Sequence, residues 1–197
     1  MVVPPEVQRR LVHATGAVVP LAYLLFDVPW RWVQLAWTLA ALGGLLLEAL
    51  RLSGVVQWRI YDTLTREYEQ DNLAGYALYL VSMCGVAWLF PPSVVPGAAV
   101  AGMLMLALGD PVSGLLGSGE LQSVKGTPVL LAMFAVCLAI ALGVGLAPVP
   151  AIAGAAAATV ADGVKPVVAT YVIDDNLTIP PAAAVGVLLG TYLLGVA

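Results

Sequence analysis

Long uncharged segments dominate the chain and are separated by short polar ones. Residues 73–109, 128–161 and 176–197 carry no Asp, Glu, Lys or Arg. A helix crosses the apolar layer of a membrane, ~30 Å thick, with about 20 residues, so the first two segments are too long for one crossing. Proline interrupts them at 91–96 and at 147–151. We expect each to fold back there as a helical hairpin.

The N-terminal part of the chain adds two further apolar segments, at about residues 11–28 and 32–52. Together the segments predict an all-α, polytopic integral membrane protein of about seven transmembrane helices. These helices are expected to form a single membrane-embedded domain, residues 1–197. The apolar run after Arg9 and Arg10 is followed directly by further apolar segments, so it is expected to be the first membrane helix and not a signal peptide.

Composition strengthens this prediction. The chain is 61% hydrophobic and only 10% charged, whereas about 25% of the residues of an ordinary soluble domain are charged. An ordinary soluble fold is therefore excluded. No nucleic-acid partner is expected, and the oligomeric state stays open.

The distribution of charge orients the chain. If the N-terminus is cytoplasmic, all eight basic residues except Arg31 fall on the cytoplasmic side, as the positive-inside rule requires. The same orientation places the polar segments 53–72, 109–127 and 162–176 on that side, while the outer turns are short and rich in proline. We therefore expect a multi-pass protein of the cell membrane that works at its cytoplasmic face.

The first candidate site is the segment "ALGDPVSGLLGSGELQSVKGT", residues 107–127. An acidic residue ends an apolar helix there, and glycines and a lysine follow. Glycine lets backbone N–H groups approach phosphates closely, and lysine supplies a positive charge. The spacing is not that of a Walker A loop, and a flexible loop with close helix packing is the alternative. The candidates are Asp110, Gly114, Gly117, Lys125, Gly126 and Thr127.

The second candidate site is "IDDNLTIP", with Asp174, Asp175 and Asn176 between two apolar runs. Two adjacent carboxylates at a membrane edge need a counter-charge, and a metal ion is the expected one. A helix cap formed by Asp175 or Asn176 is the alternative, but a cap needs only one acidic residue.

Other charged residues admit two interpretations each. Asp162 is either a functional acid at the edge of an Ala-rich span or the partner of Lys165 at i,i+3 spacing. Arg10 and His13 either line an anion site at the inner face or only set the topology.

Two further pairs are expected to be structural. Glu48 and Arg51, three residues apart near the end of a span, suit an ion pair within the fold. Gly186 and Gly190 form a small-residue face that suits helix packing.

Acidic residues outnumber basic ones on the inner face. The chain has 12 acidic and 8 basic residues, and only Asp27 and Arg31 fall on the outer side. A triphosphate would therefore need a divalent metal to bridge carboxylates and phosphate oxygens. Mg²⁺ suits this role, because it binds through one or two carboxylates together with substrate phosphates.

Five motifs occur in an order that resembles the polyprenol kinase family, which includes dolichol kinase and phytol kinase and is related to phosphatidate cytidylyltransferase. They are "RRLVHATGAVVPLAYLL", "LAGYALYL", "LALGDPVSGLLG", "KGT" and "IDDNLTIP". The most specific part is "GDPVSGLLG" followed by Lys125 and then "IDDNLTIP". The chain departs from the family in having Asp162 where a Glu is frequent. It also lacks the Glu of the family's G-K-[ST]-x-E-G-[ST] stretch around Lys125.

The resemblance implies a CTP-dependent kinase that phosphorylates the hydroxyl of an isoprenoid lipid alcohol of the dolichol, polyprenol, phytol or geranylgeraniol type, with Mg²⁺. The alternatives are a cytidylyltransferase that makes a CDP-activated lipid from a lipid phosphate, and a membrane transporter without catalytic activity. Transport would require polar residues inside several spans, and residues 73–109 have almost none.

The implied roles fall into four groups. The metal ligands are Asp110, Asp174 and Asp175. The catalytic residues are Asp110, Lys125 and Asp162. The nucleotide-binding residues are Gly114, Gly117, Lys125, Gly126, Thr127 and Asn176. Further candidates are Arg10, His13 and Lys165.

Overall fold

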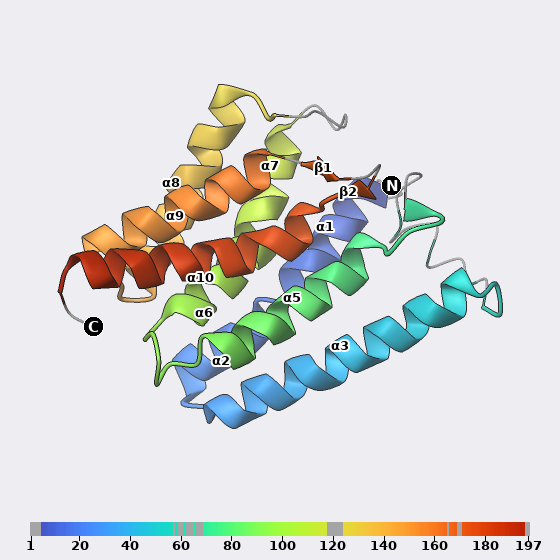
Figure 1. Ribbon diagram of the computed structural model, residues 1–197, viewed down its shortest axis with the longest axis horizontal. Coiled ribbons are helices and arrows are strands. Elements are labelled where there is room, and N and C mark those ends of the chain that lie inside the picture. Colours follow the sequence, from blue (N-terminus) through green and yellow to red (C-terminus); the bar gives the residue numbers. More distant parts are fainter. Residues whose placement is uncertain are drawn as a thin grey trace.

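The computed structural model describes residues 5–56, 58, 61, 65, 69–117, 124–164, 166–168 and 171–195. In these residues the chain is almost entirely helical (Figure 1). The helices are α1 (Pro5–Thr15), α2 (Val18–Phe26), α3 (Trp30–Leu52), α5 (Gly75–Leu89), α6 (Ala98–Leu104), the π-helical turn η2 (Met105–Gly109), α7 (Asp110–Leu116), α8 (Thr127–Gly143), α9 (Pro148–Gly163) and α10 (Asp175–Leu193). A short antiparallel hairpin of β1 (Val167–Val168) and β2 (Tyr171–Val172) joins α9 to α10. The all-α prediction is confirmed.

Three helical stretches of the described residues are long and apolar enough to cross a membrane. They are α3, the continuous stretch Ala98–Leu116 that α6, η2 and α7 form together, and α10. A membrane protein is therefore indicated, as the sequence predicted.

The prediction of about seven spans is not confirmed. The expected span at residues 11–28 is divided between α1 and α2, and each is shorter than a crossing at 1.5 Å per residue. The division falls at Gly16, where a Cβ atom would lie 1.8 Å from the Tyr79 hydroxyl. Helices α5 and α8 are apolar but also shorter than the spanning three.

Both expected hairpins turn at their prolines. Residues 90–97 connect α5 to α6 and contain Pro91, Pro92 and Pro96, and Pro148 is the first residue of α9. Proline is favoured in the first turn of a helix, where its missing N–H is not needed.

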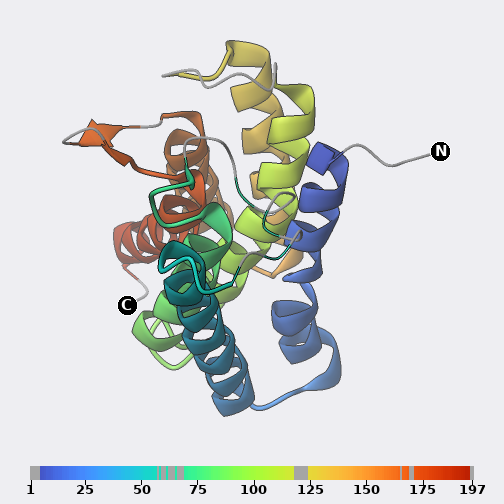
Figure 2. The same cartoon turned by 90° about the vertical axis from the view of Figure 1, so that its right-hand side faces the viewer.

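The core lies around α6 and η2, where nearly every side chain is buried. Helix α10 packs on α9 through Gly186 and Gly190, which adjoin Ala153 and Pro150. The packing face predicted for the two glycines is thus confirmed. Viewed from the side, α1 and α2 lie across α7 from α9 and α10 (Figure 2).

The polar ends of the helices gather at one end of the bundle. The ends of α3 and α9 and the starts of α5, α8 and α10 lie along the upper and right-hand sides of the bundle in Figure 1. The described parts of the polar segments that the sequence placed on one side therefore do lie at a common end.

A buried ion pair fixes the loop before α5. The Arg51 Nη2 and Nε atoms lie 2.6 and 2.9 Å from the two oxygens of Glu48, which is 1% exposed. Glu48 also accepts hydrogen bonds from the Ala74 backbone N–H and the Tyr76 hydroxyl. Arg51 in turn donates to three loop carbonyls, those of Glu69, Gln70 and Asn72. The expected structural pair is confirmed.

Candidate active site

Three carboxylates from distant parts of the chain meet at the polar end of the bundle. One oxygen each of Asp110, Asp162 and Asp175 lies within 4.8 Å of the other two. Asp162 and Asp175 are 0% and 2% exposed, and Asp110 is partly buried. Buried carboxylates are ordinarily paired with cations or bound to metals, so this triad, Asp110, Asp162 and Asp175, is a candidate metal site.

Local structure explains how each member reaches the triad. Asp110 follows the π-helical turn η2, a wide turn that shifts the direction of the side chains after it. Asp162 lies in the last turn of α9 and Asp175 is the first residue of α10. The β1–β2 hairpin reverses the chain between them, which brings the two helix ends together.

Lys125 neutralises part of the triad. Its Nζ lies 2.6 Å from Asp162 Oδ1 and 3.9 Å from Asp175 Oδ2. It also donates a 3.0 Å hydrogen bond to Ser113 Oγ, which in turn donates to Asp162 Oδ2 at 2.7 Å. The Lys125 backbone N–H donates to the Gly163 carbonyl at 3.0 Å, so both its main chain and its side chain are held at the end of α9.

The charges of the triad are not balanced by Lys125 alone. Three carboxylates face one ammonium group, and burial, opposed by Lys125, raises the pKa of the Asp162 carboxyl to about 6. A divalent cation would supply the missing charge. Oxygens on opposite sides of a Mg²⁺ ion are about 4.2 Å apart, so oxygens within 4.8 Å need only small movements to share one. The residues fit Mg²⁺.

Asp174 lies outside the triad, and its assignment as a metal ligand stays a prediction. It is the N-cap of α10, and its Oδ1 accepts hydrogen bonds from the Asn176 backbone N–H at 2.9 Å and from Asn176 Nδ2 at 2.5 Å. The third carboxylate beside Asp110 and Asp175 is instead Asp162. The ion-pair partner of Asp162 is Lys125, and Lys165 lies outside the described residues.

Gly114 provides space for Arg10. A Cβ atom at Gly114 would lie 1.8 Å from Arg10 Nη1, and this nitrogen donates to the carbonyls of Asp110 and Pro111 at 3.3 and 3.4 Å. Close packing, the alternative offered for the glycine segment, is therefore present at Gly114.

The other candidates in that segment, Gly117, Gly126 and Thr127, lie at helix ends. Gly117 follows the last residue of α7, and Gly126 and Thr127 are exposed at the start of α8, next to Lys125. Their role in binding phosphate stays a prediction.

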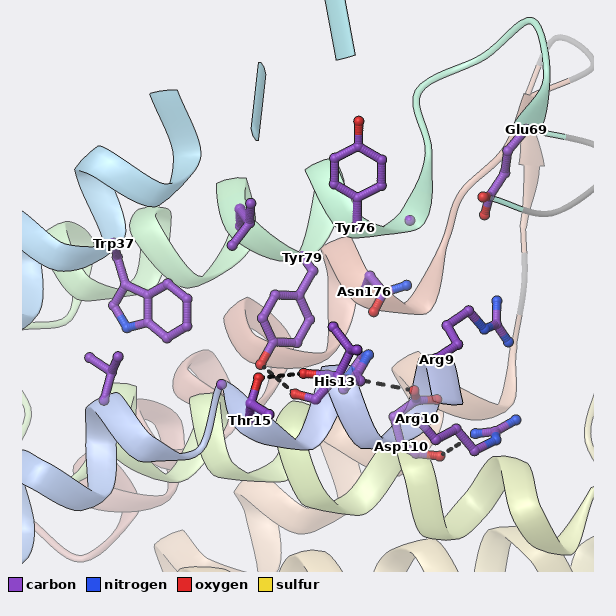
Figure 3. Close-up of a pocket in the computed structure, with 15 residues that line it drawn as sticks. Arg9, Arg10, His13, Thr15, Trp37, Glu69, Tyr76, Tyr79, Asp110 and Asn176 are labelled. Carbon is purple, nitrogen blue, oxygen red and sulfur yellow. Dashed lines mark hydrogen bonds and ion pairs between the residues drawn. The ribbon is translucent and has the colours of Figure 1, made fainter. Parts of the chain in front are cut away.

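A cavity of about 410 Å³ adjoins the triad at Asp110 (Figure 3). Helices α1, α2, α3 and α5 and the start of α10 enclose it. One part of its lining is polar and consists of Arg9, Arg10, His13, Glu69, Asp110 and Asn176. Another part is apolar, with Val19, Trp37 and Leu80, and Tyr76 and Tyr79 also contribute. Such a lining suits a molecule with a polar head and an apolar body.

His13 lies beside this cavity with one ring nitrogen engaged by the backbone. Its Nε2 lies 3.0 Å from the Leu106 carbonyl, which only accepts, so this nitrogen carries the hydrogen. Burial lowers the pKa of His13, although Asp110 at 3.7 Å opposes this. Arg9 and Arg10 place positive charge at the cavity wall beside His13.

Several residues of the site were not predicted from the sequence. Ser113 is three residues after Asp110, and this helical spacing could have placed it on the same face. Trp37, Tyr76 and Tyr79 lie in apolar runs, where nothing in the sequence distinguishes a cavity wall from a packed core.

Comparisons of the chain with protein-family models, with curated proteins and with solved structures find no match. Its function is therefore inferred from the site and from the motifs of the sequence.

Proposed function

We propose that this protein is a membrane-embedded kinase that uses CTP and Mg²⁺ to phosphorylate the hydroxyl group of an isoprenoid lipid alcohol. One observation carries the proposal: Asp110 belongs both to the carboxylate triad and to the lining of the cavity. A phosphate held at the triad and an amphiphile held in the cavity would meet at this residue.

The chemistry of the triad supports the nucleotide side of the reaction. Asp110, Asp162 and Asp175 would hold Mg²⁺, which would supply positive charge to offset that of the phosphates. Lys125, 18% exposed at its side chain, is positioned to exchange its contact with Asp162 for one with a phosphate. The choice of CTP as donor rests on the resemblance of the motifs to polyprenol kinases.

The main contribution of the protein to the reaction is to position the alcohol and the phosphate. The alcohol oxygen forms a bond to the γ-phosphorus of CTP, the bond from that phosphorus to the β,γ-bridging oxygen breaks, and CDP leaves with the electron pair. The hydroxyl proton passes to a carboxylate, and Asp110 is the triad member that lines the cavity. Phosphoryl transfer has a loose transition state, so alignment and charge stabilisation provide most of the rate enhancement.

The surroundings of the cavity support a lipid as acceptor. Three helices are long and apolar enough to span a membrane, and the cavity combines a charged part near Asp110 with an apolar part near Trp37. The bias of basic residues toward one side supports a site at the cytoplasmic face of the cell membrane.

The test is phosphate transfer by the purified protein in detergent. CTP labelled at the γ-phosphate, Mg²⁺ and geranylgeraniol should give labelled geranylgeranyl phosphate, and Asp162→Ala or Asp110→Ala should abolish the transfer. Release of pyrophosphate with a CDP-lipid product from geranylgeranyl phosphate would instead make the protein a cytidylyltransferase. Absence of both reactions would contradict any catalytic role of the triad.

A further inference from the structure

The side-chain amide of Asn176 has a defined orientation. Its Nδ2 lies 2.5 Å from Asp174 Oδ1, and a carboxylate oxygen can only accept, so the nitrogen and not the oxygen faces Asp174. The amide oxygen is therefore directed away from the cap. In Figure 3 it lies on the side of Asn176 toward His13 and Asp110, while the nitrogen points away from them.

This oxygen is a buried acceptor that lacks a donor. Asn176 is 8% exposed and lines the cavity, and its Oδ1 has no hydrogen-bond partner within the described part of the chain. An acceptor left in this state destabilises the protein unless a ligand or water supplies the hydrogen. The structure thus contains a buried acceptor, Asn176 Oδ1, that no donor of the described residues satisfies.

Three ring donors around the cavity, those of His13, Tyr79 and Tyr76, are already engaged elsewhere. The His13 Nε2–H faces the Leu106 carbonyl, the Tyr79 hydroxyl donates to the His13 carbonyl, and the Tyr76 hydroxyl donates to Glu48. None of these three groups turns its hydrogen toward Asn176. A bound molecule that carries an O–H group would satisfy the acceptor.

We infer that Asn176 recognises the hydroxyl head of the acceptor alcohol before the nucleotide binds, with Oδ1 accepting the hydroxyl hydrogen in that complex. This inference rests on the proposed function and gives Asn176 a partner other than the nucleotide. The apolar body of the alcohol extends along Val19, Trp37 and Leu80. Asn176 is then a specificity residue, because a head group that cannot donate leaves its oxygen unpaired in a buried site.

The test compares geranylgeraniol with its methyl ether, which has the same chain but no hydroxyl hydrogen. Binding is measured without nucleotide by displacement of tritiated geranylgeraniol from the protein in detergent, with empty micelles as background. The unaltered protein should bind the ether about tenfold or more weakly than the alcohol. In Asn176→Leu the ratio of the two affinities should fall to near one, because the acceptor has been removed.

Ser82→Ala is the matched control. It removes a buried hydrogen bond to the Leu177 carbonyl at the start of α10, and Ser82 is not part of the cavity lining. It should leave the ratio unchanged. The ratio of the two affinities is taken within one variant. A general loss of folded protein therefore reduces the binding of both ligands and leaves the ratio unchanged.

Three results would overturn the inference. The first is that the unaltered protein binds the ether and the alcohol equally well, as expected if water satisfies Asn176. The second is that the unaltered protein binds neither ligand. The third is that the ratio of the two affinities is unchanged in Asn176→Leu. If phosphate transfer occurs while the ratio is unchanged, the kinase stands and the role of Asn176 fails. If the ratio changes as expected but no transfer occurs, the recognition stands and the kinase fails.

Discussion

Lys125 Nζ lies 2.6 Å from Asp162 Oδ1, although the two residues are 37 positions apart in the chain. Ser113 completes the arrangement, since it accepts from Lys125 and donates to the other Asp162 oxygen. Each polar atom of the Asp162 carboxylate therefore has a donor, even though the residue is fully buried. The lysine holds an acidic site together and occupies the place where a cation would bind.

Replacing Lys125 should separate these two effects. In Lys125→Met, Asp162 and Asp175 lose the ammonium group that pairs with them, so the protein without metal should be destabilised by about 3 kcal/mol. The same change removes a competitor for the cation, so Mg²⁺ should raise the melting temperature more in the variant than in the unaltered protein. Thermal unfolding in detergent with and without Mg²⁺ measures both. An equal Mg²⁺ response in the two proteins would show that Lys125 and the metal do not share the site.

Substitutions in "IDDN" should distinguish the metal ligand from the cap. Asp175→Asn should weaken Mg²⁺ binding at least about tenfold, because it removes a ligand. Asp174→Ala should leave Mg²⁺ binding close to that of the unaltered protein and cost about 1 kcal/mol of stability, the usual cost of losing an N-cap. Calorimetric titration with Mg²⁺ and thermal unfolding provide the two readouts. If Asp174→Ala abolishes Mg²⁺ binding while stability is kept, Asp174 is a ligand after all.

The sequence predicted the helical fold and its turns because both depend on local signals. Uncharged length fixes where apolar helices can form, and proline fixes where the two hairpins turn. The division of residues 11–28 was not predictable in the same way. It depends on the Tyr79 hydroxyl, which approaches Gly16 from a distant helix.

The sequence identified the acidic residues of the candidate site more readily than their roles. Asp110, Asp162 and Asp175 stand out because carboxylates are rare in apolar segments. Adjacent Asp174 and Asp175 look equivalent in sequence, and only the direction of each side chain at the start of α10 distinguishes them. The pairing of Asp162 with Lys125 could not be predicted from the sequence either, because the two residues come close only after α8 and α9 have packed.

Gly114 and Gly117 should differ although both were assigned to nucleotide binding. Gly114→Ala places a methyl group 1.8 Å from Arg10 Nη1, so the guanidinium must leave the carbonyls of Asp110 and Pro111. Transfer of phosphate to geranylgeraniol should then fall severalfold. Gly117→Ala is the matched control, because the nearest described atoms to its new methyl group would lie at 3.6 Å, an ordinary contact.

Turnover and the KM for CTP of both variants decide between packing and phosphate binding at these glycines. A loss confined to Gly114→Ala, reproduced by Arg10→Met, supports the packing role. An equal rise in the KM for CTP in both variants would instead support a phosphate-binding loop.

The Glu48–Arg51 pair should stabilise the fold as a unit, so single and double substitutions should not be additive. Arg51→Leu leaves the carboxylate of Glu48 buried with one fewer cation, and a cost of about 3–5 kcal/mol is expected. Glu48→Leu leaves Arg51 its three loop carbonyls and should cost less. The double variant Glu48→Leu with Arg51→Leu should be more stable than Arg51→Leu alone, because no buried charge remains unpaired. Denaturant unfolding of the four proteins measures the coupling, and additive costs would mean that Glu48 and Arg51 contribute independently of each other.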